Sequence, residues 1–182
     1  MRSTSIPFLK TAVAALASLI LFATASLADI SRFVGDYEGT AQVTGADGTP
    51  SPRNMSVQIS EIKDGFSVAW TSGTRRADGS FKSKSYEIDF RMSERDGIYA
   101  AAQKKNIFGH SVQLDPMKGE PYVWAQLAGD TLTVYSMFVT DDGGYEIQQY
   151  DRTLAAGGLD LNFSRSRNGE ELRSVSTFLT KQ

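Results

Sequence analysis

The most constraining feature of this chain is a series of short turn signals spaced along residues 45–170. Most of them contain Asp-Gly, Asn-Gly or Gly-Gly, and these residues tolerate the positive φ angles that tight hairpin turns require. A chain that reverses direction this often is typical of antiparallel strands joined by hairpins. The turn signals lie at 45–48, 63–65, 77–80, 95–97, 129–130, 141–144, 157–158 and 167–170.

The segments between these turns alternate apolar and polar residues, as strands with one buried face do. In the run 81–93, for example, Tyr86, Ile88 and Phe90 alternate with charged and hydroxyl side chains. No segment of the mature region has the period of a convincing amphipathic helix, so the fold class is all-β. The predicted strands are 31–44, 53–62, 65–75, 81–93, 97–105, 121–128, 131–140, 144–155, 159–167 and 171–180.

An antiparallel meander of eight to ten strands removes its exposed edges by closing into an up-and-down barrel. A β-sandwich is the alternative architecture, but it usually needs longer Greek-key crossings between its two sheets. Only one connection is long here, roughly residues 106–121. We therefore predict an antiparallel up-and-down barrel of 8–10 strands, preceded by an N-terminal signal helix.

Residues 1–28 have the layout of a secretory signal peptide: a positive start with Arg2 and Lys10, an apolar run, and Ser26-Leu27-Ala28 before the cleavage point. The alternatives are cleavage after 23–25 or an uncleaved membrane anchor, for which the apolar run is short. We expect the domains to be 1–28, the signal peptide, and 29–182, the barrel. The mature protein, which loses two cations and carries a net charge of −4 instead of −2, is then a periplasmic protein that does not span a membrane.

Composition excludes several function classes. The chain has 19 Lys and Arg against 21 Asp and Glu, whereas nucleic-acid binders need a dense basic surface. It has no Cys and a single His, so a disulfide scaffold, a thiolate site and a two-His metal site are all impossible within one chain. It also lacks a phosphate loop and the common hydrolase motifs. We therefore expect no nucleic-acid partner, no cofactor and no enzymatic activity.

One motif resembles a known family. The segment Phe33–Gly39 resembles the G-x-W-x-G start of lipocalin-like (calycin) barrels, with Tyr37 in place of the usual Trp. The resemblance implies a lipocalin-like fold in which Arg173 of the last strand packs across Tyr37 and closes the barrel floor. The segment Asp115–Trp124 is also similar to one in uncharacterised exported proteins of alphaproteobacteria, a likeness that implies no function.

A barrel of this size has room either for packed side chains or for one small ligand. In the carrier hypothesis, Arg152 or Arg165 holds the polar head of a small hydrophobic or lipid-like molecule, because a guanidinium offers a planar fork of donors. The alternative role for these arginines is cross-strand ion pairing. The residues expected along the apolar tail of the ligand are Tyr86, Phe90, Trp124 and Phe163.

Two other functions stay open at this stage. Large aromatic residues at many inward positions also fit a filled barrel, which would then act as an interaction module that grips an envelope protein with the 106–121 loop. The least favoured hypothesis is a haem-binding or enzymatic barrel built around His110, since one imidazole suffices as an axial haem ligand. A cavity of several hundred Å³ would favour the carrier.

Overall fold

The computed structural model of the protein describes residues 29–44, 49–75, 79–101, 104–105, 111–112 and 114–182. The predicted signal peptide, 1–28, and its helix lie outside these described residues. No helix within the described part of the chain is long and apolar enough to cross a membrane.

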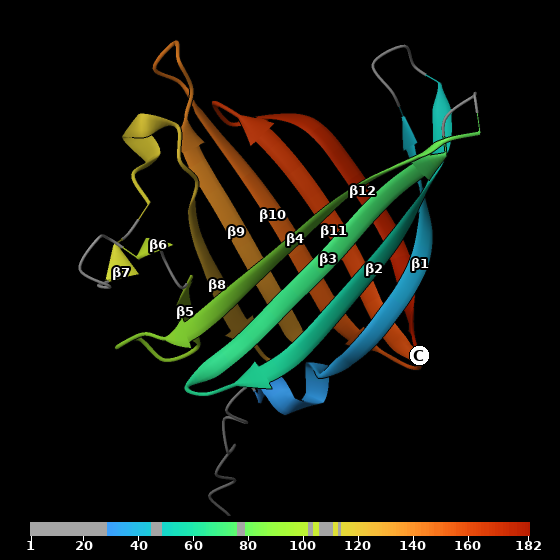
Figure 1. The fold of residues 1–182 in the computed structure, drawn as a ribbon, viewed down its shortest axis with the longest axis horizontal. Coiled ribbons are helices and arrows are strands. Elements are labelled where there is room, and N and C mark those ends of the chain that lie inside the picture. The colour runs from blue at the N-terminus through green and yellow to red at the C-terminus, as the bar shows by residue number, and fades with distance from the viewer. Residues whose placement is uncertain (1–28, 45–48, 76–78, 102–103, 106–110, 113) are drawn as a thin grey trace, which may run out of the picture.

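Ten strands form one closed antiparallel barrel, which confirms the predicted fold class (Figure 1). Strands that follow one another around the barrel are neighbours in sequence, and the first and last strands pair to close it. The barrel strands are β1 (Gly35–Thr44), β2 (Pro50–Ile62), β3 (Gly65–Arg75), β4 (Phe81–Met92), β5 (Ile98–Ala101), β8 (Tyr122–Ala128), β9 (Thr131–Val139), β10 (Tyr145–Ala155), β11 (Gly158–Arg167) and β12 (Glu170–Lys181).

The first strand starts later than predicted. Residues 31–34 were expected to open the strand 31–44, but Ile30–Phe33 forms a short 3₁₀ helix, η1. The Asp29 side chain accepts a hydrogen bond from the Ser31 backbone N–H at 2.9 Å and so caps this helix. The helix brings Phe33, which is fully buried, to one end of the barrel, and this end is therefore closed.

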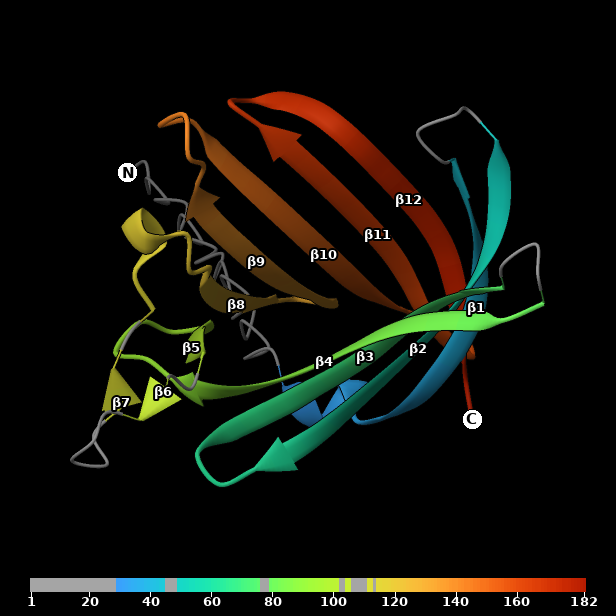
Figure 2. The ribbon, with the colours of Figure 1, turned by 45° about the horizontal axis from the view of Figure 1, so that its top comes forward.

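The described parts of the long connection between β5 and β8 lie outside the barrel (Figure 2). The predicted strand 97–105 is shorter than expected, because β5 ends at Ala101 and pairs with each of its neighbours over only three residue positions. Beyond it, β6 (Lys104–Lys105) and β7 (Ser111–Val112) form a separate two-stranded sheet. A second 3₁₀ helix, η2 (Pro116–Lys118), precedes β8 and is capped by the Asp115 side chain.

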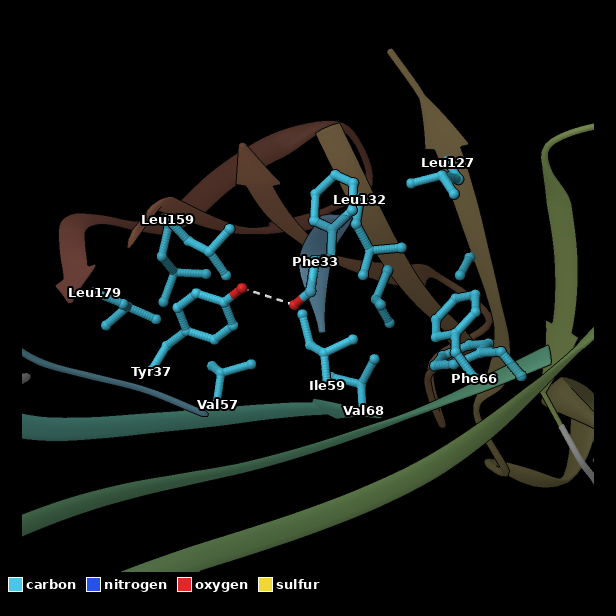
Figure 3. Close-up of a cluster of buried hydrophobic side chains, with 14 residues drawn as sticks. Phe33, Tyr37, Val57, Ile59, Phe66, Val68, Leu127, Leu132, Leu159 and Leu179 are labelled. Atoms are coloured by element: carbon cyan, nitrogen blue, oxygen red, sulfur yellow. Dashed lines mark hydrogen bonds between the residues drawn. The ribbon is translucent and has the colours of Figure 1, made fainter. Parts of the chain in front are cut away.

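The closed end of the barrel holds a filled apolar core (Figure 3). Tyr37 extends into this core and its hydroxyl donates to the carbonyl oxygen of Phe33 at 2.7 Å, which satisfies the buried phenol and fixes η1 as a plug. The core consists of Phe33, Tyr37, Val57, Ile59, Phe66, Val68, Phe90, Ala125, Leu127, Leu132, Val134, Leu159, Leu161 and Leu179.

Neighbouring strands approach each other closely at this end. A Cβ atom on Gly65, the first residue of β3, would lie on the carbonyl oxygen of Phe90 in β4. Only glycine fits there, because a carbonyl in a paired strand cannot move without disturbing the ladder.

Candidate functional site

A cavity of about 530 Å³ opens at the end of the barrel opposite η1. It begins where the filled core stops, since Val57 and Leu161 belong to both the core and the cavity wall. The cavity is lined by Val43, Arg53, Met55, Ser56, Val57, Trp70, Thr71, Ser72, Thr74, Lys82, Lys84, Tyr86, Tyr150, Arg152, Leu161, Phe163, Arg173 and Val175.

A chain of four aromatic rings crosses the inside of the barrel at the base of this cavity. Trp70 of β3 stacks on Tyr86 of β4 with ring centroids 5.2 Å apart. On its other side Trp70 lies 5.6 Å from Tyr150, which in turn lies 4.7 Å from Phe163. Because β3 and β10 are far apart around the barrel, the contact between Trp70 and Tyr150 spans the lumen. These rings form an apolar floor and two facing walls.

Arg152 of β10 lies within this aromatic floor. Alternation along β10 places it on the inner face with Tyr150, and it is paired in register with Leu132 and Leu161. Its side chain is 1% exposed, and its guanidinium carbon lies 5.8 Å from the centroid of Trp70 and 5.7 Å from that of Tyr150. A buried cation with two aromatic neighbours and no carboxylate in contact is unusual, because buried charges are normally paired.

Arg152 is charged but lacks hydrogen-bond partners for two of its nitrogen atoms. Its Nε and Nη1 atoms are buried and have no hydrogen-bond partner. Burial lowers the pKa of Arg152 to about 10, a depression that the nearby Tyr150 and Asp151 partly oppose. The guanidinium therefore stays charged at neutral pH while two of its donors are unsatisfied. A guanidinium in this state can donate to an anionic acceptor.

Four more cations line the same cavity nearer its opening: Arg53, Lys82, Lys84 and Arg173. Among the described lining residues there is no Asp or Glu, although acidic residues outnumber basic ones in the chain as a whole. The described part of the cavity wall thus carries a charge opposite to that of the protein. Such a cavity attracts anions and raises their local concentration.

Arg165, the other arginine predicted to hold a ligand, has a partner. Its Nε donates to Oε1 of Glu146 at 2.6 Å and its Nη2 donates to Oε2 at 2.8 Å, a bidentate pair. The hydrogen bonds from Arg165 are the main cause that lowers the pKa of Glu146, while burial of the carboxylate opposes the shift. The guanidinium edge that would bind a ligand carboxylate is therefore occupied. Arg165 forms a cross-strand ion pair, which was the alternative role for this residue.

The structure brings three of the six predicted ligand-binding residues together: Tyr86, Phe163 and Arg152 all line the cavity. Phe90 is fully buried in the filled core, where it stacks on Phe66 with centroids 5.2 Å apart.

The predicted inward placement of Trp124 is wrong. Its neighbours in sequence on β8, Val123 and Ala125, pack in or against the core, so Trp124 lies on the outer face and stacks there on Tyr135 at 4.8 Å. The prediction from alternating apolar and polar residues assigned the inner and outer faces of this strand the wrong way round.

Of the two residues expected to form the barrel floor, only Tyr37 lies in the core at the closed end. Arg173 lies at the opposite end, where it lines the cavity and faces Arg165 across β11 and β12. The last-strand cation beside Tyr37 is instead Lys181, whose Nζ lies 5.6 Å from the ring centroid and donates to the Val34 carbonyl at 2.7 Å. The prediction considered only arginine, whereas the cation beside Tyr37 is a lysine near the end of the last strand.

Sequence reasoning missed Tyr150 and Arg53 as cavity residues. Tyr150 lies two residues from Arg152 and so shares its strand face, and this spacing was the only feature of the sequence that indicated a place in the cavity. His110 and residues 106–109 and 113 of the 106–121 loop lie outside the described residues. Within the described part of the chain, no group of three or more His, Cys, Asp or Glu side chains is placed to hold a metal ion.

Comparison with known proteins adds little to this description. No protein-family model and no curated protein matches the chain. The crystal structure of Rv2717c from M. tuberculosis is similar at a TM-score of 0.48 and 14% identity, over 84% of this chain and 94% of that chain.

Proposed function

We propose that this protein binds a small amphipathic anion, a molecule with an apolar body and an anionic head, inside its barrel. The observation that carries the proposal is the buried guanidinium of Arg152, which has two unsatisfied donors at the floor of a 530 Å³ cavity. A buried donor without a partner costs free energy, and a ligand carboxylate removes that cost.

The rest of the cavity fits the apolar body. Trp70, Tyr86 and Phe163 offer ring faces and edges, while Met55 and Val175 complete an apolar wall above them. The cavity volume lies within the range of small-molecule sites, which bury most of the ligand surface behind a few well-placed polar groups. This supports the carrier hypothesis over a completely filled barrel.

The proposal keeps the lipocalin-like (calycin) assignment, the periplasmic location and a role in binding without catalysis. The contact between the first-strand aromatic Tyr37 and the last-strand cation Lys181 supports the family resemblance. The signal-like sequence of residues 1–28 supports export.

An interaction module is the second candidate, and one observation favours it. Tyr122, Trp124 and Tyr135 form an aromatic cluster on the outer face of β8 and β9, next to the end of the 106–121 loop. Aromatic clusters of this kind are common at protein interfaces. The two functions are compatible, because the cluster and the cavity lie on opposite faces of the sheet.

The test compares decanoic acid with its methyl ester by isothermal titration calorimetry, using ligand-free protein comprising residues 29–182. The two probes differ mainly in charge, and a charge-assisted hydrogen bond in a buried site is worth about 2 kcal/mol, so we expect the acid to bind roughly thirtyfold more tightly.

Arg152→Met should remove this preference. The matched control is Arg91→Met, which removes an exposed arginine at the other end of the barrel and should change nothing. Equal binding of acid and ester by the unmodified protein, or a preference that survives Arg152→Met, would refute the proposal.

A further inference from the structure

The cavity contains two separate groups of positive charge. One is Arg152 at the floor, and the other is the set of Arg53, Lys82, Lys84 and Arg173 nearer the opening, here called the mouth cations. Of the mouth cations only Arg53 has a described partner, through a hydrogen bond from its Nε to Thr74 Oγ1 at 3.1 Å. None forms an ion pair with a described acidic residue.

The position of Arg173 makes this lack of counter-charge costly. It lies directly across from Arg165 in the register of β11 and β12, and like charges at such positions repel. Glu146 neutralises Arg165, but its two carboxylate oxygens both accept from that side chain. Glu146 therefore leaves Arg173 without a described carboxylate partner.

The charge distribution around the opening favours a small molecule over a flat anionic surface. The mouth cations come from β2, β4 and β12, and exposed acidic residues also lie around the opening, at one hairpin tip and at the start of β12 itself. These are Asp141 and Asp142 between β9 and β10, and Glu170 and Glu171 at the start of β12. An anionic membrane laid across the opening would meet both signs of charge.

The separation of the two groups follows from the strand geometry. The Tyr86 ring stacks on Trp70, over which the Arg152 guanidinium lies, so Tyr86 marks the level of the floor. Lys84 and Lys82 follow on the same face of β4, two and four residues nearer the opening. At a rise of about 3.3 Å per residue they lie roughly 7 and 13 Å along the strand from that level.

We infer that the natural ligand is a dianion: an apolar molecule with one anionic group for Arg152 and a second, roughly 7–13 Å away, for the mouth cations. This inference rests on the proposed function, since it takes Arg152 as the site of the first group. It narrows the ligand class from simple fatty acids to molecules that carry negative charge at both ends. The apolar walls between the two groups of cations accommodate the body of such a molecule.

The experiment measures binding of octanedioic, decanedioic and dodecanedioic acids, each against its own monomethyl ester. The ester keeps the length and one carboxylate, so the comparison isolates the second charge. At low salt we expect at least one diacid to bind about tenfold more tightly than its ester, and we expect the ratio to fall as salt screens the exposed mouth cations.

Lys82→Ala/Lys84→Ala should reduce that ratio to near one, because it weakens binding of the diacid far more than binding of the ester. The charge-matched control, Lys63→Ala/Lys118→Ala, removes two exposed lysines that do not line the cavity and should preserve the ratio.

The outcomes distinguish failure of the dianion inference from failure of the proposed function. If diacids and monoesters bind equally but Arg152→Met weakens both, the dianion inference is wrong and the proposed function stands. If Arg152→Met changes neither affinity, both are wrong. Binding to phosphatidylglycerol vesicles with no preference for diacids would also overturn the inference, in favour of a lipid surface as the partner of the mouth cations.

Discussion

Replacing Arg152 by Met should make the ligand-free protein more stable while it abolishes anion binding. Met is unbranched, matches the aliphatic stem of Arg without its guanidinium, and can fill irregular gaps between aromatic rings. The substitution removes a buried charge whose Nε and Nη1 have no partner. Buried ions replaced by apolar residues of similar volume often leave a protein more stable by about 1–4 kcal/mol.

Two calculations give the magnitude. Each unsatisfied donor costs about 1–3 kcal/mol, which the contacts with Trp70 and Tyr150 offset by about 1 kcal/mol each. In the second calculation, depression of the Arg152 pKa from its ordinary value to about 10 corresponds to about 3 kcal/mol against the charged form. We expect a gain of about 2 kcal/mol, or roughly 4–8 °C in Tm for a domain of this size.

The pH dependence provides a second test of the same reasoning. Because the folded pKa is below the unfolded one, both states are protonated at neutral pH and the gain from Arg152→Met is constant there. Above about pH 10 the unfolded wild type binds more protons than the folded one, so wild-type stability rises and the difference between the two proteins shrinks.

Urea unfolding of both proteins without ligand is the assay, followed by the same measurement with saturating decanoic acid, which should stabilise only the wild type. Destabilisation of the ligand-free variant by more than about 1 kcal/mol would show that Arg152 is a structural residue and would refute the argument.

Three further predictions concern other parts of the barrel. Glu146→Gln should lower stability at about pH 7 and much less at about pH 3. The pKa of the Glu146 carboxylate is lowered by folding, so its ionised form contributes stability above its unfolded pKa, and this contribution is lost as the pH falls. A difference in urea midpoint that does not change with pH would contradict this. A bound ligand should change the fluorescence of the variant that retains only Trp70 and not of the one that retains only Trp124, since these two tryptophans lie inside and outside the barrel; equal responses would place the ligand elsewhere. Gly65→Ala should lower stability by about 2 kcal/mol or more in thermal unfolding, because its Cβ meets a backbone carbonyl that cannot yield, and an unchanged Tm would show that β3 and β4 can separate there.

The sequence predicted the barrel well because its two signals are local. Turns such as Lys63-Asp64-Gly65 mark where the chain reverses, and Asp64 indeed adopts a positive φ of 64°. Alternation then identifies the strands between turns. The errors lie where a local signal competes with another: Asp29 caps a 3₁₀ helix at residues 30–33 that would otherwise continue an alternating pattern.

The site was harder to predict because it depends on contacts between distant strands. Arg152 and Arg165 both lie on inner faces of adjacent strands, and alternation treats them alike. What separates them is Glu146, which reaches Arg165 on the neighbouring strand and leaves Arg152 without a carboxylate. The meeting of Arg152 with Trp70 across the lumen depends on the curvature of the barrel, which no spacing in the sequence encodes.

Arginine is the residue type that best keeps a permanent positive charge at position 152. Lysine has a lower ordinary pKa of about 10.4, so the burial that lowers the pKa of Arg152 would bring a lysine in the same place closer to losing its proton at neutral pH. Arginine begins high enough to stay charged after the same depression, and its fork of donors matches the two oxygens of a carboxylate. The filled core below, from Phe33 to Leu179, supplies the stability that tolerates this charge. A barrel that kept its interior only for packing would gain from an apolar residue here, so the buried guanidinium supports the anion-binding role that we propose.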